Sequence, residues 1–547
     1  MKATVAVAAL LISGLSPLTG TALAHDGTEA GAERLGSVRF ATSCAPAVQP
    51  RFDRAVALLH SFHLDAAVGG FTEVAAADPA CGMAHWGVAM AWLGNPLAAP
   101  PSARGLQEGG AAVARARAAG ARTARENDYI GAIEIFYKDA DTVPHRTRAL
   151  AYEKAMEQIA TRYPADREAA AFYALALNIT LDPNDKTYAN QLKAAGILEK
   201  VFAEQPNHPG VAHYLIHSYD FPPIAAKGLP AARRYASIAP SAPHALHMPS
   251  HIFTRVGDWA ESIETNRASA KAAADTLAAS GPQTGLRSYE GLHAYDYMMY
   301  GYLQLARDRE ARVLVDEVTS TRKLNVDHFA GAFALAAIPA RFALERGQWA
   351  EAAALTPRPG DLAWSKFPQA ESIVWFARGL GAARSGDPAR ARQDLARIEA
   401  LRDGMTAAKS LYWAHQSEVQ RLAVAAWIAR AEKRDDEALA LMRASAEAED
   451  ETEKHPVTPG PIKPARELLA EMLIEVGRPA SALQEVEASH RVEPNRFQGL
   501  YVAARAAELA GESTKARVYY VRLVDLGKDA HPSRPELEQA RRFVGAK

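Results

Sequence analysis

The chain has 547 residues, and its 62 Lys and Arg residues against 63 Asp and Glu residues give a formal net charge of −1 at pH 7. This balance argues against nucleic acid or an anionic membrane surface as a partner. Only two residues are cysteines, which excludes a zinc cage built from thiolates, so any metal must be held by nitrogen and oxygen. The length exceeds that of one ordinary globular core, yet no Ser/Gly-rich linker divides the chain.

The first 24 residues predict a cleavable export signal. Lys2 precedes an apolar stretch from Ala3 to Leu15, and residues 21–24 form a small-residue cleavage pattern. This stretch is shorter than the roughly 20 apolar residues that a membrane helix needs, and no later stretch reaches that length. We therefore expect a periplasmic or secreted protein that is cut after Ala24.

Cleavage at that point makes His25 the first residue of the mature chain. An amino-terminal histidine is able to chelate copper through its amine and its ring. We expect residues 25–40 to form a flexible segment, because the stretch up to Gly36 lacks apolar content.

The two cysteines, Cys44 and Cys81, lie in the first helical unit. In an oxidising compartment an isolated pair favours a disulfide, with two buried thiols as the alternative. The same region holds three histidines, His60, His63 and His85. Their apolar neighbours favour ordinary packing, and the alternatives are that they ligate a metal or extend the polar inner surface of the protein.

Two histidine pairs stand at a fixed interval. His213 and His217 are four residues apart, and His247 and His251 repeat that spacing 34 residues later. Residues four apart lie on one face of a helix, and such a pair is a common way for one helix to supply two ligands to zinc or copper. Pro249 stands inside the second pair, so we expect a helix to begin near Met248 there.

Other polar residues near the pairs are candidate further ligands, groove residues or a general base: His244, His293, Asp220, Glu290 and Asp296. Two other interpretations of the pairs stay open. The histidines are also able to bond backbone carbonyls and carboxylates at a packed interface, or to recognise an acidic ligand in a polar groove.

Turn glycines followed five residues later by alanine recur in the carboxy-terminal half, at Gly347/Ala352, Gly386/Ala391, Gly477/Ala482 and Gly511/Ala516. The last two pairs are again 34 residues apart. With the histidine interval, these positions resemble the tetratricopeptide repeat (TPR) family over roughly residues 52–526. The resemblance implies an all-α, right-handed superhelical solenoid of helix-turn-helix repeats, in which the first helix of each pair lines the concave face.

The resemblance also implies how the chain is organised. We expect an amino-terminal solenoid over 41–310, with the histidines on its concave face, and a carboxy-terminal solenoid over 311–547. The charged and then proline-rich segment 449–464 is expected to be an exposed connection between helices.

Two functions follow as hypotheses. The first is an exported repeat protein whose groove has a histidine-lined metal or polar-ligand site, holding copper, zinc or iron at His213, His217, His247 and His251 and able to act as a metalloenzyme. The second is a metal-free scaffold that binds a peptide, a protein or a small polar molecule in the groove. The sequence names no catalytic residue and no substrate.

Overall fold

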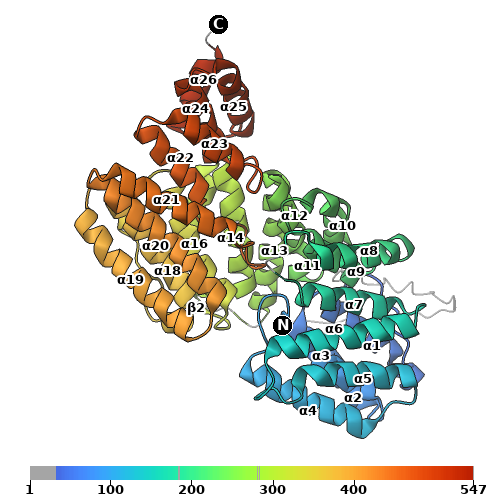
Figure 1. Ribbon diagram of the computed structural model, residues 1–547. Coiled ribbons are helices and arrows are strands. Elements are labelled where there is room, and N and C mark those ends of the chain that lie inside the picture. The colour runs from blue at the N-terminus through green and yellow to red at the C-terminus, as the bar shows by residue number, and fades with distance from the viewer. Residues whose placement is uncertain (1–32, 183–184, 280, 282–283, 532, 546–547) are drawn as a thin grey trace, which may run out of the picture. The chain divides into compact units, whose positions relative to one another are not determined.

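The computed structural model describes residues 33–182, 185–279, 281, 284–531 and 533–545 (Figure 1). The predicted export signal, the predicted cleavage site and His25 lie outside these residues. The chain divides into two compact units, Met1–Arg34 and Leu35–Lys547, and the second contains all the elements described below. None of the helices in the described ranges combines the length and the apolar character that a membrane crossing requires.

The amino-terminal part of the second unit is a succession of α-helices in which consecutive members pack side by side (Figure 1). They are α1 (Gln49–His60), α2 (Leu64–Ala77), α3 (Gly82–Ala91), α4 (Ala103–Ala119), α5 (Ala124–Tyr137), α6 (His145–Arg162), α7 (Arg167–Ile179), α8 (Ala189–Glu204), α9 (Pro209–Tyr219), α10 (Leu229–Ile238), α11 (Pro243–His247), α12 (Pro249–Val256) and α13 (Trp259–Ala278). Two short 3-10 helices accompany them, η1 (Pro46–Val48) and η2 (Ala225–Gly228).

The carboxy-terminal part continues in the same manner. Its elements are α14 (Tyr289–Gln304), α15 (Asp308–Thr319), α16 (Phe329–Leu344), α17 (Trp349–Ala353), η3 (Trp364–Lys366), α18 (Pro368–Arg384), α19 (Pro388–Ala407), α20 (Leu411–Ala431), α21 (Asp435–Asp450), α22 (Ala465–Glu475), α23 (Pro479–Ser489), α24 (Phe497–Leu509), α25 (Ser513–Leu526) and α26 (Pro535–Gly545). Among the described residues the only strands are β1 (Leu286–Arg287) and β2 (Lys323–Leu324), which pair in parallel. The prediction of an all-α, TPR-like solenoid is confirmed.

The predicted turn glycines end helices in the left-handed conformation. Gly347, Gly386, Gly477 and Gly511 all have positive φ angles, between 62° and 83°. Glycine adopts this conformation without the steric cost that a Cβ brings. The alanines five residues later are fully buried, so each following helix lies close to the one before it. The repeat signature therefore marks real helix turns.

Two hydrophobic cores follow each other along the chain. The first joins buried residues from Leu35 to Phe253, and the second joins buried residues from Ile263 to Ala540. The predicted histidine sites fall where the first core gives way to the second, on α9, α11, α12 and α14. The expected division near residue 310 stays a prediction.

One expectation is wrong. Residues 451–464, which we call the strap, are not an exposed connection between α21 and α22, because residues 457–460 are buried. Arg341 on α16, itself fully buried, donates to the carbonyl of Gly460 at 2.8 Å and to that of Pro461. Proline and charge typify exposed loops. Here a buried guanidinium donates hydrogen bonds to the strap's carbonyls, which offsets the cost of removing those carbonyls from water.

Candidate metal centre

The four paired histidines come from helices whose starts are set by proline. Pro209 is the first residue of α9, which carries His213 and His217. His247 is the last residue of α11, and Pro249 opens α12, which carries His251. Met248 between them has helical φ and ψ angles, so the backbone continues through the expected break. Proline costs little at a first turn, where its missing N–H has no helical partner to lose.

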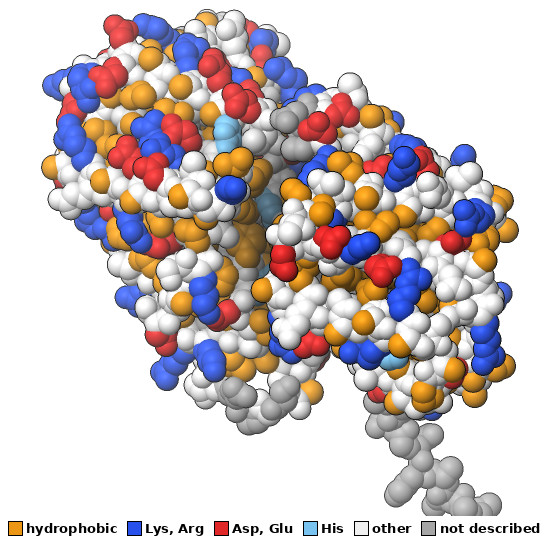
Figure 2. Space-filling model, turned by 60° about the horizontal axis from the view of Figure 1, so that its bottom comes forward, with side chains coloured by type: hydrophobic (Ala, Val, Ile, Leu, Met, Phe, Trp, Pro, Cys, Tyr) orange, Lys and Arg blue, Asp and Glu red, His pale blue; other side chains and the backbone are white. Residues whose placement is uncertain are grey.

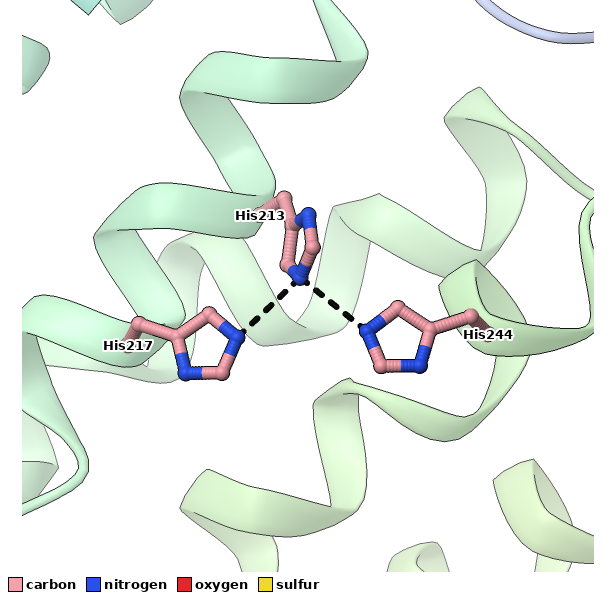
Figure 3. A group of neighbouring side chains, drawn as sticks. All are labelled: His213, His217 and His244. Carbon is pink, nitrogen blue, oxygen red and sulfur yellow. Dashed lines mark hydrogen bonds between the residues drawn. The ribbon is translucent and has the colours of Figure 1, made fainter. Parts of the chain in front are cut away.

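His213, His217 and His244 form the first cluster, which we call group A (Figure 3). Nε2 of His213 lies 3.1 Å from Nε2 of His217 and 3.2 Å from Nε2 of His244, so the three nitrogens converge on one point. His213 and His217 are buried, while His244 on α11 is half-buried. The third ring therefore comes from the repeat that follows α9.

His247, His251 and His293 form the second cluster, group B. Nε2 of His247 lies 3.1 Å from Nε2 of His251, and the rings of His247 and His293 are 4.3 Å apart between centroids. His293 is half-buried and lies on α14, again in the next repeat. Group B thus repeats the plan of group A one repeat further along the chain.

The two groups adjoin each other. The rings of His217 and His251 are 5.8 Å apart between centroids, and those of His244 and His247 are 6.0 Å apart. The structure therefore divides the four predicted histidines two and two, and completes each pair with one of the further candidates, His244 or His293. Figure 2 shows histidine side chains within a hollow of the surface, between apolar walls.

The nitrogen separations within each group fit a bound ion. Nitrogen ligands about 2.0–2.1 Å from a tetrahedrally coordinated ion lie about 3.3–3.4 Å from one another. The Nε2 separations from His213 to His217 and His244, 3.1 and 3.2 Å, and the separation of 3.1 Å between His247 and His251 are close to that value. Three rings per group leave a fourth position for another ligand.

Group B leaves no proton for the contact between its two paired rings. His247 donates its Nδ1–H to Oδ1 of Asn266 at 2.7 Å, and the Asn266 amide nitrogen donates to a backbone carbonyl, which fixes that orientation. His251 donates its Nδ1–H to the carboxylate of Asp220 at 2.9 Å. Both neutral rings therefore present a bare Nε2 lone pair to the other, an arrangement that a cation between them would stabilise.

Group A has a similar partner on one ring. Nδ1 of His213 donates to the carbonyl of His60 at 2.6 Å, which leaves its Nε2 as an acceptor facing two other ring nitrogens. Gly210 permits this contact, because a Cβ there would lie 2.3 Å from the His60 ring. A neutral ring nitrogen has one in-plane lone pair, so a single ion satisfies the three converging nitrogens better than hydrogen bonds do.

Burial keeps these rings neutral. Burial, assisted by the neighbouring His251, lowers the pKa of His247 to about 3. Burial is also the main cause that holds the pKa values of His213, His217, His244 and His293 well below 6.5, assisted in each case by other histidines of the two groups. Neutral imidazole is the form that binds metal, so the site is preorganised for ligation at neutral pH.

Asp220, another candidate ligand, serves as a support for His251. Besides the His251 ring, its carboxylate accepts from Arg255 Nε at 2.9 Å and from Lys454 Nζ at 2.6 Å. These two cations hold the pKa of Asp220 far below its usual range against the opposing effect of burial. Carboxylate–histidine pairs of this kind fix the tautomer and orientation of metal ligands.

The amino-terminal histidines lie elsewhere. His60 and His208 both bond the buried carboxylate of Glu168, at 2.8 and 2.9 Å, while the other ring nitrogens bond Tyr214 and the Val211 N–H. With each ring nitrogen and both carboxylate oxygens engaged, this cluster is a packed hydrogen-bond network. It supports the site only through the His60 carbonyl.

None of the remaining candidates belongs to the three-histidine groups found among the described residues, although His63 lies near enough to His244 to help lower its pKa, after the larger effect of burial. His63 precedes α2, and His85 is half-buried on α3. Glu290 lies one helical turn before His293, half-buried. Asp296 is buried against Arg341, 3.2 Å away, and burial raises its pKa to about 6. Cys44 and Cys81 form the predicted disulfide, with their Cα atoms 4.9 Å apart.

Two supporting residues, Asn266 and Lys454, were not foreseen from the sequence, and Tyr297 belongs to an aromatic run, residues 295–302, that favours helix packing over a ligand platform. Tyr297 lies one turn after His293 on α14, which is a detectable signal once His293 is taken as a ligand. Asn266 on α13 and Lys454 on the strap come from distant parts of the chain, and no local pattern points to them.

No protein-family model matches the chain. No curated protein matches it. Among solved structures, a human IFIT1 dimer with m7Gppp-AAAA aligns at 12% identity and a TM-score of 0.39, covering 81% of this chain and 90% of that chain. A tetratricopeptide repeat protein from Parabacteroides merdae aligns at 12% identity and 0.28, covering 55% and 98%. The Cut9–Hcn1 hetero-tetramer of the APC/C aligns at 8% identity and 0.27, covering 90% and 96%. Similarity at this level supports no argument about function.

Proposed function

We propose that this protein is an exported helical-repeat metalloprotein that binds two transition-metal ions, one in group A and one in group B. The observation that carries the proposal is the 3.1 Å contact between Nε2 of His247 and Nε2 of His251. Both Nδ1–H groups are already donated, to Asn266 and Asp220, so no proton remains for that contact. An ion between the lone pairs removes the conflict.

Copper is the metal that the donor set favours. Each group offers imidazole nitrogen alone, a donor that suits copper, zinc, iron and nickel, whereas carboxylates suit harder ions. Among divalent first-row metals, copper binds such nitrogen sites most tightly. Copper would supply one-electron redox chemistry here, and zinc, the second choice, would supply Lewis-acid chemistry.

The chain's own residues build the chemical setting of the two ions. Asp220 and Asn266 hold the group B rings with their Nε2 atoms turned inward, and the His60 carbonyl does the same for His213. The separation of 5.8 Å between the His217 and His251 rings places the groups side by side, so two ions would form one centre. The half-buried rings, His244 and His293, mark the side from which a ligand would enter.

Export is part of the proposal. The Cys44–Cys81 disulfide supports it, because disulfides persist in the periplasm and outside the cell and are rare in the cytosol. Together with the signal pattern of the first 24 residues, it favours a periplasmic or secreted protein.

Binding of a peptide or protein partner is the second candidate function. It is favoured by a cavity of about 440 Å³ lined by aromatic and polar residues of α18, α20 and the strap, among them Phe376, Trp413 and Gln416. The strap lines part of this cavity, so a partner would have only the space that the strap leaves open. For this reason we place the metal function first.

The experiment is elemental analysis of the full protein purified without a histidine tag. We expect two copper equivalents per chain, one lost in His217→Ala and one lost in His251→Ala. His415→Ala is the matched control. His415 lies on α20, bonds the Ala448 carbonyl at 2.7 Å and belongs to neither group. Copper below half an equivalent after reconstitution, or equal retention in all three variants, would refute the proposal.

A further inference from the structure

The Tyr297 hydroxyl lies beside the inward-facing nitrogen of a group B ring. Its oxygen is 3.3 Å from Nε2 of His251, and it donates its proton to the carbonyl of Thr458 in the strap at 3.0 Å. The Tyr297 ring contacts every ring of the group, with centroid distances of 4.7 Å to His247, 5.2 Å to His251 and 5.4 Å to His293. A buried hydroxyl therefore stands at the inner face of group B.

Phe62 occupies the corresponding place at group A. Its ring centroid lies 4.5 Å from that of His213, 5.6 Å from that of His244 and 6.4 Å from that of His217. Phe62 is in the turn between α1 and α2 and has a positive φ of 50°. A phenylalanine has no hydroxyl, so the side of group A that Phe62 covers is apolar, whereas Tyr297 brings a hydrogen-bond donor to group B; the tyrosine at group A, Tyr235, stacks flat on the His213 ring at 5.4 Å between centroids.

We propose that the two ion positions differ in function. Group B, and not group A, binds a small polar or anionic ligand, and Tyr297 is the positioning residue that donates a hydrogen bond to this ligand. This inference rests on the proposed function. The hydroxyl proton needs only to rotate from the Thr458 carbonyl toward the ligand, so no covalent bond is formed or broken. Phe62 offers the group A ion no hydrogen-bond donor. Group A therefore holds the second ion of the centre but does not position the small ligand.

Two features of the surroundings favour this role. Burial raises the pKa of Tyr297 well above 10, so the side chain stays a phenol that is able to donate. Asp220 lies on the far side of the His251 ring, where it is paired with Arg255 and Lys454. The carboxylate is thereby held away from an anion entering between the rings, and repulsion is reduced.

Azide is the probe, because its binding to copper(II) produces a charge-transfer absorption band that can be titrated. In the copper-loaded protein we expect Tyr297→Phe to keep two copper equivalents and to bind azide about 10-fold more weakly, as expected when a hydrogen bond to a charged group is lost. Tyr302→Phe is the matched control: it removes a hydroxyl from the same helix, one that bonds Arg267 at 3.1 Å instead of a ring of either group, and is expected to leave azide affinity unchanged.

Single-group variants test which ion takes the ligand. His217→Ala, which leaves group B intact, should retain azide binding, and His251→Ala should lose it. The inference is overturned if Tyr297→Phe binds two copper ions and azide as tightly as the unaltered protein, or if His217→Ala is the variant that loses azide. Failure of the copper count itself is a different result, since it overturns the proposed function before azide is added.

Discussion

Asp220 shows how one residue can support both the fold and the candidate metal centre. It fixes the tautomer of His251 and at the same time neutralises Arg255 and Lys454, which are both buried. Replacing it with asparagine keeps the shape but leaves two buried cations without a carboxylate. We expect Asp220→Asn to lower the free energy of unfolding by about 3–5 kcal/mol and the copper affinity of group B by about 10- to 100-fold.

Urea unfolding and copper titration measure the two effects. The matched control is Asp296→Asn, which also breaks a buried carboxylate–arginine pair but touches no ligand ring. It should destabilise the fold and leave copper affinity within about twofold. Equal losses of copper affinity in both variants would show that Asp220 acts through global stability alone.

The neutral histidines also make the metal-free protein sensitive to acid. Burial lowers the pKa of His247 to about 3 in the folded protein, against about 6.5 in the unfolded chain, so between these pH values the unfolded chain binds the extra proton. Its contribution to stability is complete above pH 6.5 and is lost as the pH falls toward 3. From pH 6.5 to 5 we expect a loss of about 2 kcal/mol from His247 alone.

Chemical denaturation of metal-free protein at pH 7.5, 6 and 5 checks this prediction. His247→Asn should show a smaller change in unfolding free energy over the same range. A stability that is flat or rises on acidification contradicts the assignment of neutral, buried rings.

At the level of single residues, the sequence predicted the two histidine pairs but not which third histidine completes each group. A spacing of four shows that two rings share a helical face, and the interval of 34 shows that the arrangement recurs. Which third ring joins each pair depends on how α11 and α14 pack, so His244 and His293 were only candidates. No sequence pattern points to Asn266, because its role depends only on its contact with Nδ1 of His247.

At the scale of elements, the strap ties together parts of the chain that are distant in sequence. His455 bonds the Ala98 carbonyl at 3.2 Å and packs on Trp413, while Lys454 bonds Asp220. The Lys454 side chain is only 5% exposed, so trypsin has little access to the bond after it. We expect His455→Ala to loosen the strap and to speed trypsin cleavage after Lys454 severalfold.

Limited proteolysis followed by mass spectrometry measures that rate. Tyr137→Phe is the control, because it removes a side-chain bond to a backbone carbonyl, that of Ala89, outside the strap. An unchanged cleavage rate in His455→Ala would mean that the Arg341 contacts alone hold the strap in place.

The helices and the strap differ in how far sequence could predict them. Turn glycines such as Gly386 and Gly477 are local signals, because a left-handed residue ends a helix whatever surrounds it. The strap was expected to be exposed because proline and charge usually mean solvent. Its burial depends on Arg341, more than 100 residues away in sequence, which no local composition records.

At the scale of the whole molecule, the candidate centre joins two hydrophobic cores. Group A and two rings of group B come from elements of the first core, whereas His293 lies on α14, which belongs to the second. An ion in group B therefore links the cores. We expect copper to raise the melting temperature, with a smaller increase in His293→Ala, measured by differential scanning calorimetry with and without copper.

The disulfide lies apart from this link. Cys44 and Cys81 join the segment before η1 to the start of α3. Replacing both with serine should cost about 2–4 kcal/mol of unfolding free energy and leave the copper count at two. Loss of copper in that variant, at a temperature where circular dichroism shows intact helices, would contradict the separation of the two features.

The borrowing of a third ring from the following repeat has an evolutionary consequence. A pair on one helix gains its third ring only when the neighbouring repeat is stacked beside it, so a three-ring group needs two adjacent units. Tandem duplication of such a unit would add a further three-histidine group next to the existing ones. The nuclearity of such a centre is then a matter of copy number, and a longer array would carry a row of ions instead of two.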